Sequence, residues 1–225
     1  MEKNNKIGTG QLISDFIQRN RKPVLVSMGA LALVFVGVLT TLFVMDVLQR
    51  RAISGLEELR ERYHALHFDI SEGTISGELQ LLLNDLGSFA ARNSGFLSGS
   101  AWAMAARIHS AMEDWPQAEA AWRYAAEAAS RTYLGPLALF NAAVAAEKQG
   151  RITEAIELFS MSASHRESFP AAAHAQFSVG RLHETLNNRA GAIEAYRAVL
   201  ARWPGASVWA NLSQSRIIFL ETERD

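Results

Sequence analysis

The sequence predicts an all-α protein: a single N-terminal transmembrane helix, then an α-solenoid of about three and a half helical hairpins with a C-terminal capping helix. Two observations support this prediction. Residues 24–45 form a run of 22 residues without a charge. Further along, three pairs of an alanine and an aromatic residue recur at a fixed interval of 37 residues, and a repeat period of about 20–50 residues is typical of solenoids.

The uncharged run predicts a transmembrane helix at residues 23–47, preceded by a short tail of residues 1–22. A helix rises about 1.5 Å per residue, so the run spans about 33 Å, enough for a hydrocarbon core of about 30 Å. A buried core helix is disfavoured because a solenoid helix is not apolar on every side. A cleaved signal peptide is disfavoured because its apolar region is usually about 7–15 residues long.

Basic residues flank the run on both sides. Five precede it in the tail, and four follow it within twenty residues. Because an excess of Lys and Arg marks the cytoplasmic side, we expect the N-terminus in the cytoplasm and the remaining chain on the outer side of the membrane. The five-to-four difference leaves the reverse orientation open.

Residues 48–70 are predicted to form a juxtamembrane helix. Apolar residues, among them Leu48, Ile53, Leu56 and Leu59, recur at three- and four-residue steps, which is the spacing of one helical face. This helix either continues the anchor and folds back on a helix that begins near Glu78, or it forms a coiled-coil dimerisation stem. Residues 69–77 form the break that follows it.

The remaining chain, residues 76–225, is predicted to be a repeat domain, with repeats at about 99–132, 136–169 and 173–206. Small residues occupy one position on the first helix of each copy, and alanine-aromatic pairs occupy the second helix. The first set is Ala106, Ala143 and Gly180, and the pairs are Ala118 with Trp122, Ala155 with Phe159, and Ala192 with Tyr196. Small side chains let two helices approach closely, and the aromatic ring fills the space between successive hairpins.

Turn signals separate the helices. Asp114 suits a helix N-cap, Gly150 suits a left-handed residue after a helix, and Pro204 ends a helix. Two flanking helices are expected, because an end hairpin would otherwise expose an apolar face. Residues 78–92 are expected to act as a half-repeat that covers the first hairpin, and residues 208–221 as the C-terminal cap.

The repeat positions resemble those of the tetratricopeptide repeat over residues 99–206. Two departures stand out: the period is 37 rather than about 34 residues, and His109, Ala146 and His183 stand where the family has a tyrosine. The extra residues are expected between copies, at residues 130–135 and 165–168. The resemblance implies a surface for protein partners.

In such a solenoid the first helices line a concave groove, and we expect the partner-binding site there. The predicted groove residues are Arg107, Phe140, Val144, Lys148, His174, Phe177, Arg181 and Glu184. Aromatic residues and arginine are enriched at binding hot spots. The alternative is that Phe140 and Phe177 pack between neighbouring hairpins, and the sequence leaves this open.

Composition and motifs argue against other function classes. The chain has no cysteine and a net charge of −1, which excludes disulfides and does not suit nucleic acid. No phosphate loop, nucleophile elbow or HExxH motif is present, and His64 and His67 lack a third metal ligand. We therefore expect no enzyme activity, no catalytic or metal site, no cofactor and no small-molecule substrate.

The whole layout of tail, anchor, helical stem and repeat domain resembles a bacterial family whose known member is the ancillary subunit of the Sec translocon. The resemblance implies a scaffold or chaperone-like accessory subunit in the cytoplasmic (inner) membrane, with its repeat domain in the periplasm. Its partners would be subunits of a membrane complex or translocated clients. The alternative is an assembly factor for an envelope machine, such as a secretion, division or flagellar apparatus, with one dedicated partner.

Overall fold

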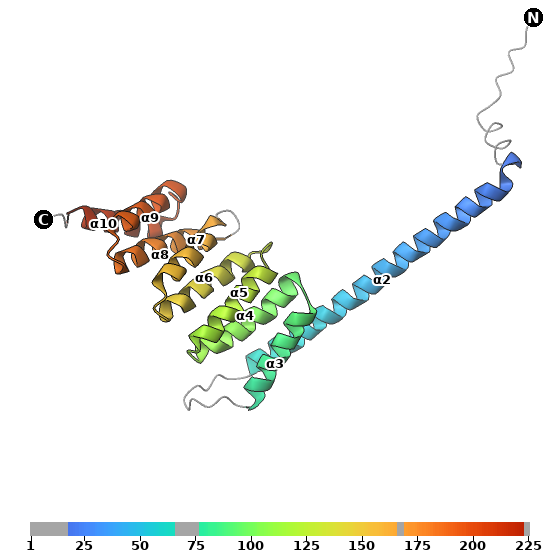
Figure 1. Ribbon diagram of the computed structural model, residues 1–225, viewed down its shortest axis with the longest axis horizontal. Helices are drawn as coiled ribbons and strands as arrows, with labels where there is room; N and C mark the ends of the chain where they lie inside the picture. The colour runs from blue at the N-terminus through green and yellow to red at the C-terminus, as the bar shows by residue number, and fades with distance from the viewer. Residues whose placement is uncertain (1–17, 66–76, 166–168, 223–225) are drawn as a thin grey trace, which may run out of the picture. The chain divides into compact units, whose positions relative to one another are not determined.

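A computed structural model describes residues 18–65, 77–165 and 169–222 of the chain (Figure 1). Most of the predicted tail, the predicted break after the juxtamembrane helix, and residues 166–168 of the predicted inter-repeat loop therefore lie outside the described residues. The described chain is helical and contains no strand, which confirms the all-α prediction.

Nine helices are described. They are α2 (Arg21–Ala65), α3 (Gly77–Arg92), α4 (Gly95–Ala111), α5 (Trp115–Ala128), α6 (Leu134–Lys148), α7 (Ile152–Ser164), α8 (Ala172–Thr185), α9 (Arg189–Arg202) and α10 (Ser207–Thr222). The chain divides into two compact units, Met1–Arg51 and Ala52–Asp225.

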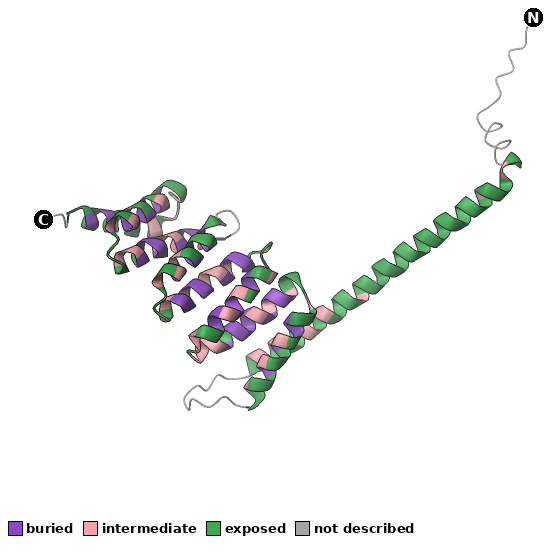
Figure 2. Ribbon diagram, in the orientation of Figure 1, coloured by how far each residue is buried: buried purple, intermediate pink, exposed green. Residues whose placement is uncertain are grey.

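The described part of the first unit is one apolar helical segment. Within the described residues, α2 is the helix whose length and composition would allow it to cross a membrane. Its side chains are exposed along the segment, with Leu33 at 76% and Phe43 at 70% (Figure 2). Apolar side chains exposed on every side of a helix require another apolar medium or partner to cover them.

The second unit begins with the last turns of α2, earlier than the predicted start of the repeat domain at residue 76. Leu56 and Leu59 are buried with Leu82, Leu86 and Phe89 of α3, and Arg62 pairs with Asp85 at 2.7 Å. The segment predicted as a half-repeat is thus the second helix of a full hairpin. Because this chain itself buries Leu56 and Leu59, they are not available for a coiled-coil stem.

Three further hairpins follow: α4 with α5, α6 with α7, and α8 with α9. The predicted small residues Ala106, Ala143 and Gly180 are buried in them, as are the aromatic rings of Trp122, Phe159 and Tyr196. The predicted turn signals act as expected. Asp114 accepts a hydrogen bond from the Gln117 N–H, and α9 ends at Arg202, before Pro204.

The three hairpin turns share a left-handed residue at the 37-residue interval. Glu113, Gly150 and Asn187 have φ of 56°, 73° and 54°. The sequence signalled only Gly150, because glycine adopts this conformation without a steric penalty. The repeat is therefore periodic in backbone conformation as well as in side-chain packing.

Candidate functional site

The predicted groove residues lie on α4, α6 and α8, the first helices of the three hairpins. Arg107 and Val144 line one cavity of about 440 Å³ between α4 and α6. The other lining residues are Ser110, Trp115, Trp122, Leu137, Asn141 and Ala145. The structure thus brings two predicted site residues together around a recess that combines aromatic, aliphatic, amide and guanidinium groups.

Two cations border this cavity. The Lys148 Nζ lies 5.7 Å from the centre of the Trp115 ring, while Arg107 is exposed. Within the described part of the chain, neither Arg107 nor Lys148 forms an ion pair. Both charges are therefore free to meet a carboxylate of a partner.

The two predicted aromatic residues are half-buried, and each contacts a ring of its own hairpin and a ring of the next element in the stack. The ring centre of Phe140 lies 5.1 Å from that of Phe159 and 4.9 Å from that of His174. The ring of Phe177 lies 5.2 Å from Tyr196 and 5.3 Å from Trp209. The contacts with His174 and Trp209 agree with the packing alternative that the sequence left open, and both rings remain partly exposed.

Two predicted charged residues are held by ion pairs. Arg181 donates two hydrogen bonds to the Glu147 carboxylate, at 2.6 and 2.7 Å, and so joins α8 to α6. Glu184 accepts hydrogen bonds from Arg216 Nε at 3.0 Å and from the Tyr196 hydroxyl at 2.5 Å. Burial acts to raise the pKa of Glu184, but these hydrogen bonds outweigh it and hold that pKa below its ordinary value.

His174 links the centre of the surface to α10. Its ring is stacked on Trp209, with the ring centres 4.0 Å apart and the planes 6° from parallel. Burial lowers the pKa of His174, and the nearby Arg181 charge lowers it further. A neutral imidazole suits this stack, since it carries no charge into a partly desolvated aromatic contact.

α10 extends the surface beyond the predicted residues. Leu212 and Phe219 are 44% and 43% exposed. They lie one turn from Trp209 and Arg216, which contact the groove residues His174 and Glu184. The sequence predicted this helix only as a cap. Its buried residues Ser213, Ile217 and Leu220 lie 38 residues after the corresponding buried residues of α8. The 37-residue interval therefore did not reveal that α10 continues the packing of α8.

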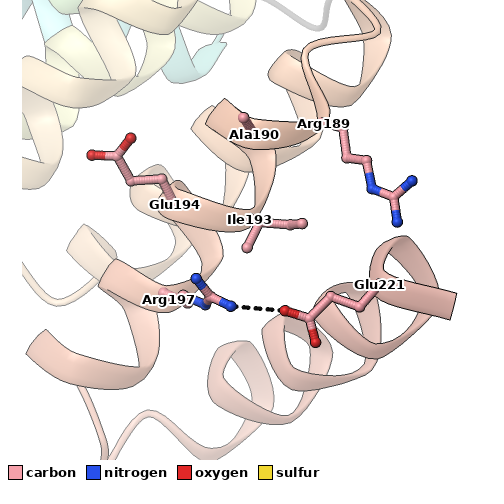
Figure 3. A pocket seen from close by; sticks show the side chains of 6 residues that line it. All are labelled: Arg189, Ala190, Ile193, Glu194, Arg197 and Glu221. Carbon is pink, nitrogen blue, oxygen red and sulfur yellow. Dashed lines mark hydrogen bonds and ion pairs between the residues drawn. The ribbon is translucent and has the colours of Figure 1, made fainter. Parts of the chain in front are cut away.

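Two other features away from this surface hold helices together. Glu119 of α5 is 4% exposed and is paired with Arg123 at 2.8 Å and with Arg151 at the start of α7. At the other end, a cavity of about 700 Å³ lies between α9 and α10, and the Arg197–Glu221 pair crosses it at 2.7 Å (Figure 3). The Glu119 carboxylate and the Arg197–Glu221 pair thus link helices of the stack.

The described residues contain no group of three or more His, Cys, Asp or Glu side chains that could hold a metal ion. His64 lines a small recess with Arg60, Tyr63, Phe96 and Tyr133, and His67 lies outside the described residues. The candidate site is accordingly the surface of first helices, which includes the α4–α6 cavity.

Comparison with known proteins agrees with this geometry. Residues 103–165 and 162–207 match the family described as tetratricopeptide repeat. The chain is also 40% identical over 124 residues to a TPR repeat-containing protein of Treponema pallidum (strain Nichols), a match that covers 55% of this chain and 51% of that protein.

The chain thus spans about half the length of that relative. The matched family consists of repeats that generally act as non-enzymatic interaction modules, and no catalytic family is indicated. Residues 103–207 of this chain therefore match the tetratricopeptide repeat.

Proposed function

We propose that this chain is a membrane-anchored scaffold or chaperone-like accessory subunit of a membrane complex such as the protein translocon. The observation that carries the proposal is the α4–α6 cavity, where Trp115, Val144 and Arg107 meet on the side of the repeats where we place partner binding. Such a surface suits a segment of another protein that presents apolar side chains beside an acidic one.

The membrane anchor in this proposal is residues 23–47 of α2. It is supported by the exposed apolar side chains of the segment, for which a bilayer is a suitable medium. Anchoring confines the repeats to the neighbourhood of a membrane complex and raises their effective concentration there, so weak contacts suffice for function. The expected location is the bacterial inner membrane, with the repeats on the periplasmic side.

Photo-crosslinking tests the binding surface. A photoreactive amino acid at Asn141, inside the cavity, should capture partner proteins in intact membranes, and the same group at Met161, exposed on the outer helix α7, should capture far fewer. Arg107→Glu should reduce capture from Asn141, whereas Arg189→Glu, on the far side of the repeats, should not. Equal capture from both positions, unaffected by Arg107→Glu, would refute the proposed surface.

The alternative function, an assembly factor with one dedicated partner, gives a different pattern in the same experiment. A chaperone-like subunit should yield a range of weakly captured clients, because an apolar recess of this kind has few specificity-determining groups. An assembly factor should yield one product at high yield. Mass spectrometry of the captured proteins therefore distinguishes the two functions.

Protease treatment of oriented membrane vesicles tests the proposed topology. In vesicles that expose the cytoplasmic face, only the 22-residue tail should be cleaved, and the repeats should remain protected until detergent is added. Immediate cleavage within residues 77–222 would reverse the orientation and place the partners in the cytoplasm.

A further inference from the structure

The cavity between α9 and α10 corresponds to a place that another helix fills elsewhere in the stack. On α5 that place is taken by α7, whose Glu154 pairs with Arg123 of α5. Two repeat intervals further along, the position of Arg123 is that of Arg197 on α9, which lines the cavity of about 700 Å³. Among the described residues, no helix follows α10 to cover this part of α9.

α10 forms the other side of the cavity. Its buried residues follow those of α8 by 38 residues, which places Ile218 at the position of Gly180. In the α8–α9 hairpin, Gly180 is buried next to the Tyr196 ring of the second helix. Ile218, by contrast, is 54% exposed, and Glu221, one turn further along α10, lines the cavity. α9 and α10 thus both present faces that contact a second helix elsewhere in the stack.

We call this cavity the α9–α10 groove. It is lined by Arg189, Ala190, Ile193, Glu194, Arg197 and Glu221 (Figure 3).

Ile218 determines which kind of helix the groove can accept. A Cβ added at Gly180 would lie 2.5 Å from the Tyr196 ring, so this position must be small where the second helix brings an aromatic residue. An isoleucine fills the same space on α10. A helix with an aromatic residue at this point, as in α5, α7 and α9, therefore does not fit, whereas a helix with alanine or glycine there does.

The charges of the groove favour an acidic residue on the incoming helix. Arg189, Ile193 and Arg197 are directed toward the turn of α10 that carries Glu221, whereas Glu194 is directed away from it (Figure 3). Arg197 pairs with Glu221, but both side chains are exposed, and a guanidinium has donors for a second carboxylate. Within the described chain, Arg189 forms no ion pair. The groove therefore offers an apolar centre at Ile193 beside two guanidinium groups.

We propose that the α9–α10 groove binds an amphipathic α-helix of another protein. A small residue of that helix lies against Ile218, an apolar residue lies against Ile193, and an acidic residue in its first turn meets Arg197. This contact continues the packing by which α7 covers α5 and α6, and α9 covers α7 and α8. The inference does not rest on the proposed function, because the α4–α6 cavity shares no lining residue with this groove.

Two synthetic peptides test the predicted fit. Both have the sequence of residues 150–165, which includes α7. One keeps Phe159, which corresponds to Tyr196 on α9, and the other carries Phe159→Ala. With the full-length protein in detergent micelles, fluorescence anisotropy should show saturable binding of the Phe159→Ala peptide and about tenfold weaker binding of the peptide that keeps Phe159. Exchange of a peptide into the place of α7 itself would give the opposite preference and would not support the proposal.

Ile218→Ala in the protein should reverse the preference between the two peptides. This change restores the small residue that the other first helices have, so the ring of Phe159 regains its space. Ile218 is half exposed, so the variant should remain folded by circular dichroism. Equal binding of the two peptides, or a preference that Ile218→Ala does not reverse, would overturn the inference.

A charge change in the peptide tests the orientation of the bound helix. Glu154→Arg in the Phe159→Ala peptide should weaken binding, because position 154 would then face Arg197 with a like charge. Glu157→Arg changes the peptide charge equally at a residue that is exposed in α7, so it should have little effect. Equal losses from both changes would contradict the proposed contact with Arg197.

Analytical ultracentrifugation in the same micelles tests a second copy of this chain as the occupant. A monomer that binds the Phe159→Ala peptide would support the proposed partner helix. A dimer that Ile193→Asp dissociates would assign the groove to a second copy and would overturn the proposal.

Discussion

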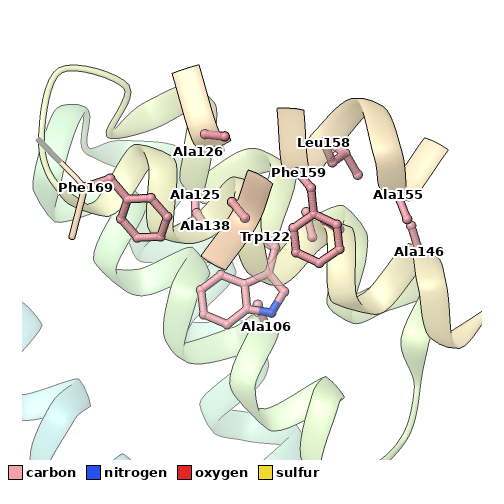
Figure 4. Packing of buried hydrophobic residues seen from close by; sticks show 14 of the residues in the cluster. Ala106, Trp122, Ala125, Ala126, Ala138, Ala146, Ala155, Leu158, Phe159 and Phe169 are labelled. Atoms are coloured by element: carbon pink, nitrogen blue, oxygen red, sulfur yellow. The ribbon is translucent and has the colours of Figure 1, made fainter. Parts of the chain in front are cut away.

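At the residue scale, the fold depends on a small residue at one position of each first helix. Trp122 and Phe159 fill the spaces between hairpins, with Ala106 beside the first ring (Figure 4). In the α8–α9 hairpin the equivalent small residue is Gly180, and a Cβ there would lie 2.5 Å from a ring carbon of Tyr196. Tyr196 is 1% exposed and hydrogen-bonded to Glu184, so its ring cannot readily move away.

Gly180→Ala should therefore destabilise the repeat domain, although alanine favours helix. Overpacking of a tight core costs about 1–3 kcal/mol, which exceeds the gain in helix propensity of up to about 1 kcal/mol. Denaturant unfolding followed by circular dichroism measures the difference.

Gly87→Ala on α3 is the matched control, because no atom lies within 4 Å of a Cβ added there. It should leave stability unchanged or raise it by up to about 1 kcal/mol through helix propensity alone. If Gly180→Ala were as stable as Gly87→Ala, the close contact between α8 and Tyr196 would be wrong.

At the element scale, α10 differs from a simple cap. It buries Ser213, Ile217 and Leu220 against the last hairpin, yet it also exposes Leu212 and Phe219 beside the candidate site. Its attachment depends on two titratable groups of α8, because His174 stacks on Trp209 and Glu184 pairs with Arg216. The α10 end of the candidate surface is thus coupled to the protonation of both groups.

We predict that acid loosens α10 in two steps. The pKa of His174 is lowered in the folded protein, so the unfolded chain, with a pKa of about 6.5, binds the proton more readily and stability falls as the pH drops below about 6.5. The pKa of Glu184 is also lowered, so its contribution is lost only as the pH falls below about 4.3.

Hydrogen exchange of α10, measured by mass spectrometry across this pH range and corrected for intrinsic rates, should show both steps. His174→Phe retains an aromatic stack without a titratable ring, so it should remove the first step and leave the second. Protection of α10 that does not change between pH 7 and pH 4 would contradict the proposed coupling.

At the scale of the whole molecule, one helix connects two chemically different units. α2 begins as an exposed apolar segment and ends as the first helix of a packed hairpin, with Leu56 and Leu59 in its core. The same helix therefore supplies both the exposed apolar segment and part of the packed core of the second unit.

Charges placed at the centre of the apolar segment should weaken membrane attachment. An arginine at the middle of a transmembrane helix costs about 2.5–3.5 kcal/mol, so Leu33→Arg with Val36→Arg should move the chain from the carbonate-resistant membrane pellet toward the soluble fraction. Leu48→Arg with Gln49→Arg, beyond the uncharged run, should not. An unmodified chain that carbonate extracts completely would argue against a membrane span.

The 37-residue spacing predicted the hairpins, their small residues and the buried rings of Trp122, Phe159 and Tyr196, because these properties repeat with the sequence. The candidate site was less predictable. Arg107 and Val144 line the same cavity, as expected if both belong to one surface. Arg181, in contrast, is hydrogen-bonded to Glu147, 34 residues away, and Glu184 is hydrogen-bonded to Arg216, 32 residues away. No local pattern signals such pairs.

The sequence by itself determined the apolar segment, the repeat period and the helix boundaries, because these depend on composition and on interactions within about one turn or one repeat. Only the tertiary structure decided that the end of α2 packs against α3, that Phe140 and Phe177 are half-buried, and that α10 contacts His174 and Glu184 of the candidate surface. Those outcomes depend on which faces meet across helices, and a shift of one residue, such as that from 37 to 38 before α10, rotates a face by about 100°.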